Sequence, residues 1–146
     1  MVSHLIERLR DYFQQEAVCF KIKAVFLYGS QATGLPRPDS DVDLAIAFED
    51  EEMSKEEVFS RMNDLAFKLV EILDCEVNLI AIGEDFSRPM LYYNAIVKGI
   101  PIFMAHPQYY SWLVKQAIDQ MEDFEIFGRG WQIGLARRNL REIWNG

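Results

Sequence analysis

The chain has 146 residues, of which 50% are hydrophobic and 26% charged, and its formal net charge at pH 7 is −8. This length suits one domain with a real core, and the hydrophobic fraction excludes an intrinsically disordered chain. The acidic balance argues against general binding to nucleic-acid backbones, and no apolar run reaches the roughly 20 residues that a membrane span needs.

Hydrophobic periodicity predicts helices and strands that alternate along most of the chain. Ser54 followed by Glu57 is typical of a capping box at a helix start, and Gly99 is typical of a helix end. In chain order, we predict a helix over 2–18, strands over 23–28 and 41–48, a helix over 55–73, a strand over 75–82, a helix over 90–98, a strand over 100–104, and helices over 108–126 and 131–145.

This order of elements predicts an α/β fold with a small mixed sheet flanked by helices. We expect catalytic groups to line one face of the sheet and helices to cover the other. We expect a single domain over 1–146, with a catalytic core over about 20–104 and a C-terminal helical segment over about 107–146. The last predicted helix is basic and rich in aromatic residues, so it either packs back on the domain or docks a partner.

The two cysteines, Cys19 and Cys75, match no metal-binding or disulfide pattern. We therefore expect two reduced thiols, as in a cytoplasmic protein. The first residues carry several charges inside their apolar pattern, which differs from a secretory signal peptide.

The most informative stretch lies between the first two predicted strands. The first strand ends in Gly29-Ser30, and Asp41 and Asp43 lie two residues apart at the start of the second. Because successive strand side chains alternate between faces, the two aspartates share one face. Neighbouring carboxylates repel each other unless a cation lies between them, and hard oxygen ligands suit Mg²⁺. A glycine after a strand lets a phosphate approach the backbone closely, so Gly29-Ser30 is a candidate phosphate-binding turn.

This arrangement resembles the nucleotidyltransferases of the polymerase β superfamily. Their signature is Gly-Ser, a spacer of about ten residues and then Asp-x-Asp, which Gly29-Ser30 and Asp41-x-Asp43 match here. The flanks Leu-Tyr-Gly-Ser-Gln-Ala-Thr-Gly and Ser-Asp-Val-Asp-Leu-Ala look like those of the minimal nucleotidyltransferases (MNT), which are small antitoxins paired with HEPN ribonuclease toxins. An ordinary turn with acidic residues on its solvent face is the plainer alternative.

The resemblance implies a chemistry and a partner. It implies that Asp41 and Asp43 bind Mg²⁺, that Gly29 and Ser30 hold the phosphates of ATP, and that AMP is transferred to a tyrosine hydroxyl of a cognate HEPN toxin. Direct nucleic-acid binding and membrane association are not expected.

The third strand is where this sequence departs from the superfamily pattern. That strand usually carries a third metal-binding carboxylate, but the matching position here is Asn78. Glu76 lies two residues earlier on the same face and is the candidate third ligand. This departure leaves open a non-catalytic antitoxin that acts by binding its toxin. A nucleotidyltransferase that modifies a small molecule such as an antibiotic is a further alternative.

Overall fold

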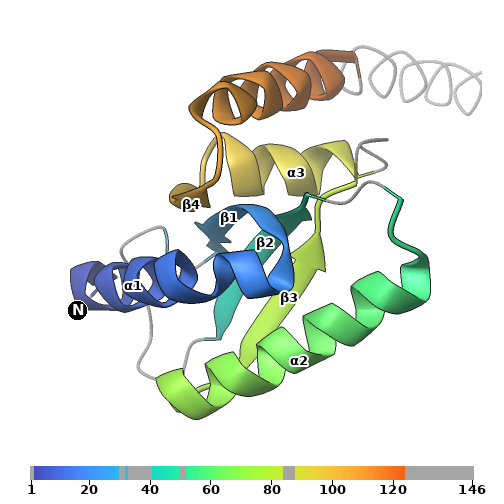
Figure 1. Cartoon of the computed structure of the whole chain (residues 1–146). Helices are drawn as coiled ribbons and strands as arrows, with labels where there is room; N and C mark the ends of the chain where they lie inside the picture. The colour runs from blue at the N-terminus through green and yellow to red at the C-terminus, as the bar shows by residue number, and fades with distance from the viewer. Residues whose placement is uncertain (1, 30–31, 33–40, 50–51, 84–87, 124–146) are drawn as a thin grey trace, which may run out of the picture.

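The structure, a computed structural model, describes residues 2–29, 32, 41–49, 52–83 and 88–123. The element order along the chain matches the predicted one through residue 123. The labelled elements are α1 (Val2–Phe20), β1 (Ile22–Tyr28), β2 (Val42–Phe48), α2 (Lys55–Leu73), β3 (Val77–Ala81), α3 (Pro89–Ile96) and β4 (Ile100–Met104). A further helix begins at residue 107 and continues to the end of the described region (Figure 1). The helix predicted over 131–145 lies outside the described residues.

The four strands form one mixed sheet in the order β3-β2-β1-β4. β1 pairs antiparallel with both β2 and β4, whereas β2 pairs in parallel with β3. The parallel pair needs a crossover between its strands, and α2 supplies it. This topology confirms the predicted α/β fold with a small mixed sheet and places β2, which carries Asp43, inside the sheet.

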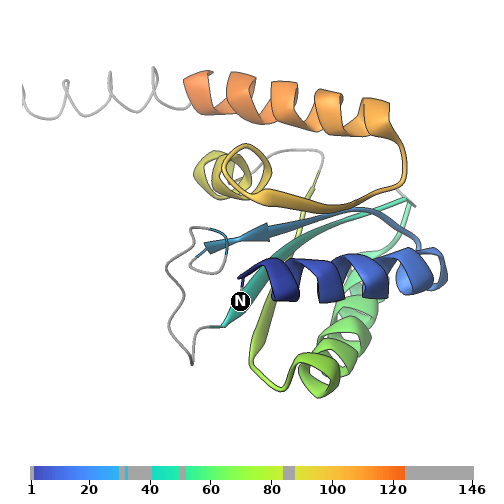
Figure 2. The same cartoon turned by 90° about the vertical axis from the view of Figure 1, so that its left-hand side faces the viewer.

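Helices cover both faces of the sheet, not one face as the sequence predicted. Figure 2 shows α1 and α2 on one side, and α3 with the helix that begins at residue 107 on the other. Two buried clusters fill the layers. β1 and β2 supply buried residues to both layers because alternate side chains point to opposite faces; β2 contributes Leu44 and Ile46 on the α1 and α2 side and only alanines on the α3 side.

Local sequence explains where α2 begins and ends. Ser54 is the N-cap, and its hydroxyl accepts a hydrogen bond from the Glu57 N–H at 3.1 Å. Asp74 closes the helix in the left-handed conformation with φ 52°, and its N–H donates to the Val70 carbonyl at 2.9 Å. The Ser54 bond satisfies one N–H that the first turn would otherwise leave unpaired. None of the described helices combines the length and apolar character needed to cross a bilayer.

The packing of α2 leads to a stability prediction with an internal control. Leu69 is fully buried on the sheet side of the helix, whereas Phe67 is 67% exposed on its outer side. We expect Leu69→Ala to lower the free energy of unfolding by about 2–5 kcal/mol, because a buried cavity is left. Phe67→Ala should change it by only about 0.5 kcal/mol. Urea denaturation followed by circular dichroism measures both; equal losses would contradict this packing.

Candidate active site

The two aspartates lie where β1 ends and where β2 and β3 begin. Asp41 immediately precedes β2, Asp43 is its second residue, and both side chains are half-buried. Val42 and Leu44 point into the core on the α1 and α2 side, so Asp43 projects from the opposite face. In the sheet register, Asp43 lies between Tyr28 of β1 and Asn78 of β3. The sheet therefore positions both carboxylates at the open end of the α3 face.

Asn78 connects the two carboxylates directly. Its side-chain nitrogen donates to Asp41 Oδ2 at 3.1 Å and to Asp43 Oδ1 at 3.2 Å. Hydrogen bonds to ionised carboxylates are stronger than neutral ones, so this single amide offsets part of the repulsion between them. No described lysine or arginine forms an ion pair with either aspartate. The two carboxylates could therefore share a bound cation.

Glu76, the predicted third ligand, lies just before β3 and pairs through its backbone with β2. Its side chain is exposed just before β3, and its carbonyl accepts a hydrogen bond from the Val42 N–H at 2.9 Å. The described residues contain no group of three histidine, cysteine or acidic side chains suited to a metal. Glu76 thus does not complete a three-carboxylate set with Asp41 and Asp43 in this structure, and its ligand role stays a prediction.

The donor set at the site nevertheless fits Mg²⁺. Asp41 and Asp43 provide carboxylate oxygens, and the Asn78 amide carries an oxygen on the same planar group as its bonded nitrogen. Rotating that amide by about 180° would turn its oxygen toward the space between the carboxylates. Mg²⁺ prefers oxygen ligands and usually keeps several waters, so a small protein donor set is sufficient.

Gly29 is required by the close approach of Asp43. The glycine has φ 76°, and a Cβ atom placed on it would collide with the Asp43 carboxylate. The turn after it is closed by the Ala32 N–H, which donates to the Gly29 carbonyl at 3.1 Å. Glycine adopts this left-handed conformation without strain and leaves the backbone beside the carboxylate open. Ser30 lies outside the described residues, so its phosphate-binding role stays a prediction.

The negative charge of the aspartates contributes to raised pKa values at two neighbouring side chains, Tyr28 and Cys75. The pKa of Tyr28 is raised, first by burial and then by the negative charge of Asp43. The pKa of Cys75 is also raised, first by burial and then by Asp41 and Asp74, while Arg8 opposes the shift. Sequence reasoning did not single out Tyr28 or connect Cys75 to the site. The β1–β2 register places Tyr28 beside Asp43, and the pairing of β2 with β3 brings Cys75 near Asp41; no local sequence pattern indicates either proximity.

A family comparison fits this geometry. The model described as "Polymerase beta, Nucleotidyltransferase" matches residues 7–108 of the chain. The chain belongs to this nucleotidyltransferase family. The matched region includes Gly29, Asp41, Asp43 and Asn78, which the structure brings together. The resemblance drawn from the sequence is thereby confirmed at the level of the family.

Solved structures share the fold of this nucleotidyltransferase. A chain in the crystal structure of a toxin–antitoxin with AMP-PNP aligns at TM-score 0.68 and 17% identity, covering 87% of this chain and 98% of that one. A chain in the complex of tri-AMPylated Shewanella oneidensis HEPN toxin with MNT antitoxin aligns at TM-score 0.64 and 15% identity, covering 90% of this chain and 98% of that one. A chain in the MntA–HepT toxin–antitoxin structure aligns at TM-score 0.64 and 15% identity, covering 89% of this chain and 98% of that one. No curated protein sequence matches the chain significantly.

The Cys75 thiol offers a titration test of the site. In a Cys19→Ser background, which leaves Cys75 as the single thiol, we expect Asp41→Asn to lower the pKa of Cys75. Removing a negative charge near the thiol favours the thiolate. The rate of alkylation by iodoacetamide as a function of pH measures that pKa. Asp119→Asn, on the distant helix that begins at residue 107, is the control. An unmoved midpoint in Asp41→Asn would contradict the proximity.

The glycine turn gives a second prediction. Gly29→Ala should lower the free energy of unfolding by about 1 kcal/mol, since an alanine is strained at a positive φ. It should also displace the Asp43 carboxylate and weaken Mg²⁺ binding, measured by isothermal titration calorimetry, by about tenfold or more. Gly99→Ala, whose added Cβ would meet backbone atoms of Ala95 and Leu27, controls for instability. Its Mg²⁺ affinity should stay unchanged wherever the variant is folded.

Proposed function

We propose that this chain is a protein adenylyltransferase antitoxin that moves AMP from ATP to a tyrosine hydroxyl of a HEPN-type toxin. One observation carries the proposal. Asp41, Asp43 and Asn78 meet at one point, held together by two side-chain hydrogen bonds, next to a glycine that keeps the backbone open. In a member of the polymerase β nucleotidyltransferase family, that cluster is suited to Mg²⁺-dependent transfer from a nucleoside triphosphate.

Each residue has a distinct part in this proposal. Asp41 and Asp43 would hold Mg²⁺, and Asn78 would complete the oxygen set or keep the carboxylates parallel. Gly29 leaves room for a phosphate beside Asp43, and Ser30 is proposed to donate a hydrogen bond to it. When bound, Mg²⁺ neutralises negative charge on the transferred phosphoryl group and on the pyrophosphate leaving group. The protein contributes mainly position and electrostatics, since phosphoryl transfer needs little covalent help.

The nature of the donor and the partner rests on the structural neighbours. One is a toxin–antitoxin with AMP-PNP, and another contains a tri-AMPylated HEPN toxin with an MNT antitoxin. Both share the fold of this chain over nearly the whole length of the matched chain. The net charge of −8 disfavours a nucleic acid as acceptor. A protein hydroxyl is therefore the acceptor that we propose.

A second candidate function follows from Asn78 itself. A neutral amide stands where the superfamily usually has a carboxylate, and it already fills the gap between Asp41 and Asp43 by hydrogen bonding. Such a site would bind a cation less tightly and would lack one candidate base. A binding-only antitoxin is the function that this feature favours.

Transfer of label decides between the two functions. The protein is incubated with Mg²⁺, ATP labelled at the α-phosphate and a co-purified HEPN-type partner, and label on the partner is measured after denaturing electrophoresis. Covalent label supports the adenylyltransferase, whereas a tight complex without label supports the binding-only antitoxin. The double variant Asp41→Asn with Asp43→Asn should reduce labelling by at least about a hundredfold. Unchanged labelling by a folded double variant would exclude this site as the catalytic centre.

Variants of the third strand identify the third ligand. Asn78→Asp restores the usual carboxylate, so we expect tighter Mg²⁺ binding, by about tenfold, and faster transfer at low Mg²⁺. Glu76→Gln tests the sequence prediction directly: a loss in both quantities would assign Glu76 as the third ligand, whereas a change of less than about twofold would leave that place to Asn78. Calorimetry and the labelling assay measure them. A large loss in Glu76→Gln with no effect of Asn78→Asp would reverse the assignment.

A further inference from the structure

The outer side of β3 is not paired with any of the described strands, because β3 is the terminal strand on its side of the sheet that they form. The Val42 N–H donates to the Glu76 carbonyl at 2.9 Å, and the Ile82 N–H donates to the Ile46 carbonyl at 2.8 Å. Because backbone groups alternate sides along a strand, the N–H groups of Val77 and Leu79 point away from β2. An unprotected edge of this kind is a template for pairing with another chain.

Two adjoining hollows run along that edge. One has a volume of about 840 Å³ and is lined by Phe59, Asn63 and Ala66 of α2 and by Val77, Asn78 and Leu79 of β3, among others. The other, of about 410 Å³, is lined by Val70 of α2, by the turn before β3, and again by Val77 and Asn78. We call the two hollows together the edge trough. One wall is the strand and the other is α2, whose Phe59 side chain is 68% exposed.

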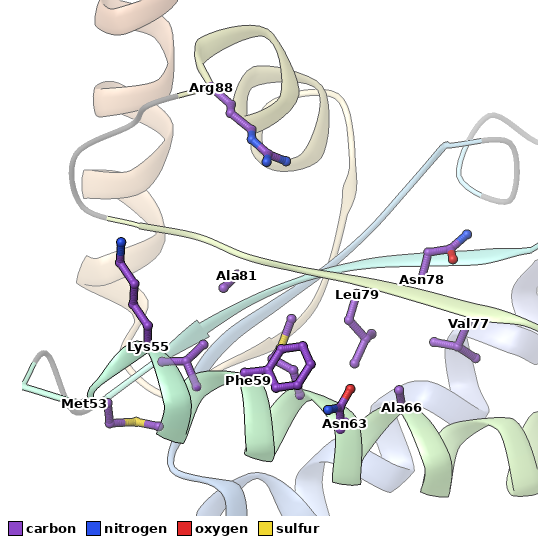
Figure 3. A pocket seen from close by; sticks show the side chains of 12 residues that line it. Met53, Lys55, Phe59, Asn63, Ala66, Val77, Asn78, Leu79, Ala81 and Arg88 are labelled. Atoms are coloured by element: carbon purple, nitrogen blue, oxygen red, sulfur yellow. The ribbon is translucent and has the colours of Figure 1, made fainter.

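The edge trough carries positive charge at one end. Lys55 and Arg88 both line the larger hollow. Figure 3 shows Lys55 extending from the start of α2 and Arg88 pointing down from the start of α3, so both side chains reach toward the Ala81 end of β3. The chain as a whole has a net charge of −8. Two cations beside an apolar trough in such a chain favour an occupant with an acidic group at that end.

The other end of the edge trough leads to the candidate active site. Asn78 lines both hollows, and its side chain donates to Asp41 and Asp43. A strand added beside β3 would lie about 4.8 Å away, and side chains on the same face of neighbouring strands have Cβ atoms about 5 Å apart. A side chain of the added strand opposite Asn78 would therefore reach the two aspartates.

We propose that the edge trough binds an extended segment of the protein acceptor, which pairs with β3 as an added strand. Its apolar side chains pack against Phe59, and an acidic residue meets Lys55 and Arg88. A hydroxyl-bearing residue about four positions away lies beside Asn78, because each strand residue advances about 3.3 Å. This inference rests on the proposed function and specifies how the acceptor hydroxyl is delivered.

The test uses a synthetic peptide and a matched pair of variants. The peptide alternates valine and threonine, has two aspartates at one end and a tyrosine about four residues away, and is made in both orientations. Fluorescence anisotropy of the labelled peptide should show saturable binding with a Kd below about 1 mM.

Phe59→Ser should weaken peptide binding by about tenfold or more, because a buried aromatic contact is lost. Phe67→Ser, on the same helix with 67% exposure but outside the edge trough, should change it by less than twofold. A peptide with lysines in place of the aspartates should bind more weakly.

Amide hydrogen exchange tests the pairing itself. We expect exchange at the Val77 and Leu79 N–H groups to slow when the peptide is added, because these groups enter new backbone hydrogen bonds. Binding without this protection, equal effects of Phe59→Ser and Phe67→Ser, or no binding at 1 mM peptide would each overturn the proposal. A second copy of the chain could instead occupy the edge. In that case, without peptide, the protection would grow with protein concentration and sedimentation would show dimers, and this result would also overturn the proposal.

The same experiment separates this proposal from the catalytic one. Peptide binding is measured without nucleotide, and again in the double variant Asp41→Asn with Asp43→Asn, where it should persist. Docking with no transfer to any acceptor leaves the edge trough standing while the adenylyltransferase proposal fails. Transfer that continues in Phe59→Ser, with unchanged KM for the protein acceptor, removes the edge trough from the reaction and leaves the chemistry intact.

Discussion

The candidate site depends on two like charges held side by side. Asp41 and Asp43 project from the same face at the start of β2, where they repel each other in the absence of a positive group. In this structure the Asn78 amide donates to both of them. An amide carries no net charge, so it orients the carboxylates while leaving most of their charge available to a cation. This balance between orientation and residual charge is what makes the cluster suited to metal-assisted phosphoryl transfer.

The sheet explains why these particular groups meet. β2 lies between β1 and β3, so its first residues face neighbours on both sides. The β1 side contributes Tyr28 and then Gly29, whose missing side chain leaves space for the Asp43 carboxylate. The parallel β3 side contributes Asn78 in register with Asp43. Apolar packing on both faces holds the three strands in place, and these strands in turn hold the polar cluster in a fixed position.

The outer edge of β3 is the surface on which our docking proposal rests. Helices cover both faces of the sheet, but none of the described strands pairs with that edge (Figure 2). The edge trough beside it combines backbone hydrogen-bonding groups, an apolar wall and two cations at one end. Such a surface recognises an extended chain by its backbone and selects it by a few side chains. Asn78 lines this trough and donates to both aspartates, so the proposed docking surface and the candidate active site share a residue.

The element order through residue 123 and the family could be predicted from the sequence, because periodicity and a short motif such as Gly-Ser with Asp-x-Asp are local properties of the chain. Strand boundaries came out within two residues, since the apolar runs end where polar residues begin. The domain division and the roles of Gly29, Ser30, Asp41, Asp43 and Glu76 stay predictions. The hydrogen bonds from Asn78 to both aspartates, the helices on both faces and the edge position of β3 are seen only in the folded structure. These features depend on strand order, register and the path of α2, which bring together residues far apart in the chain.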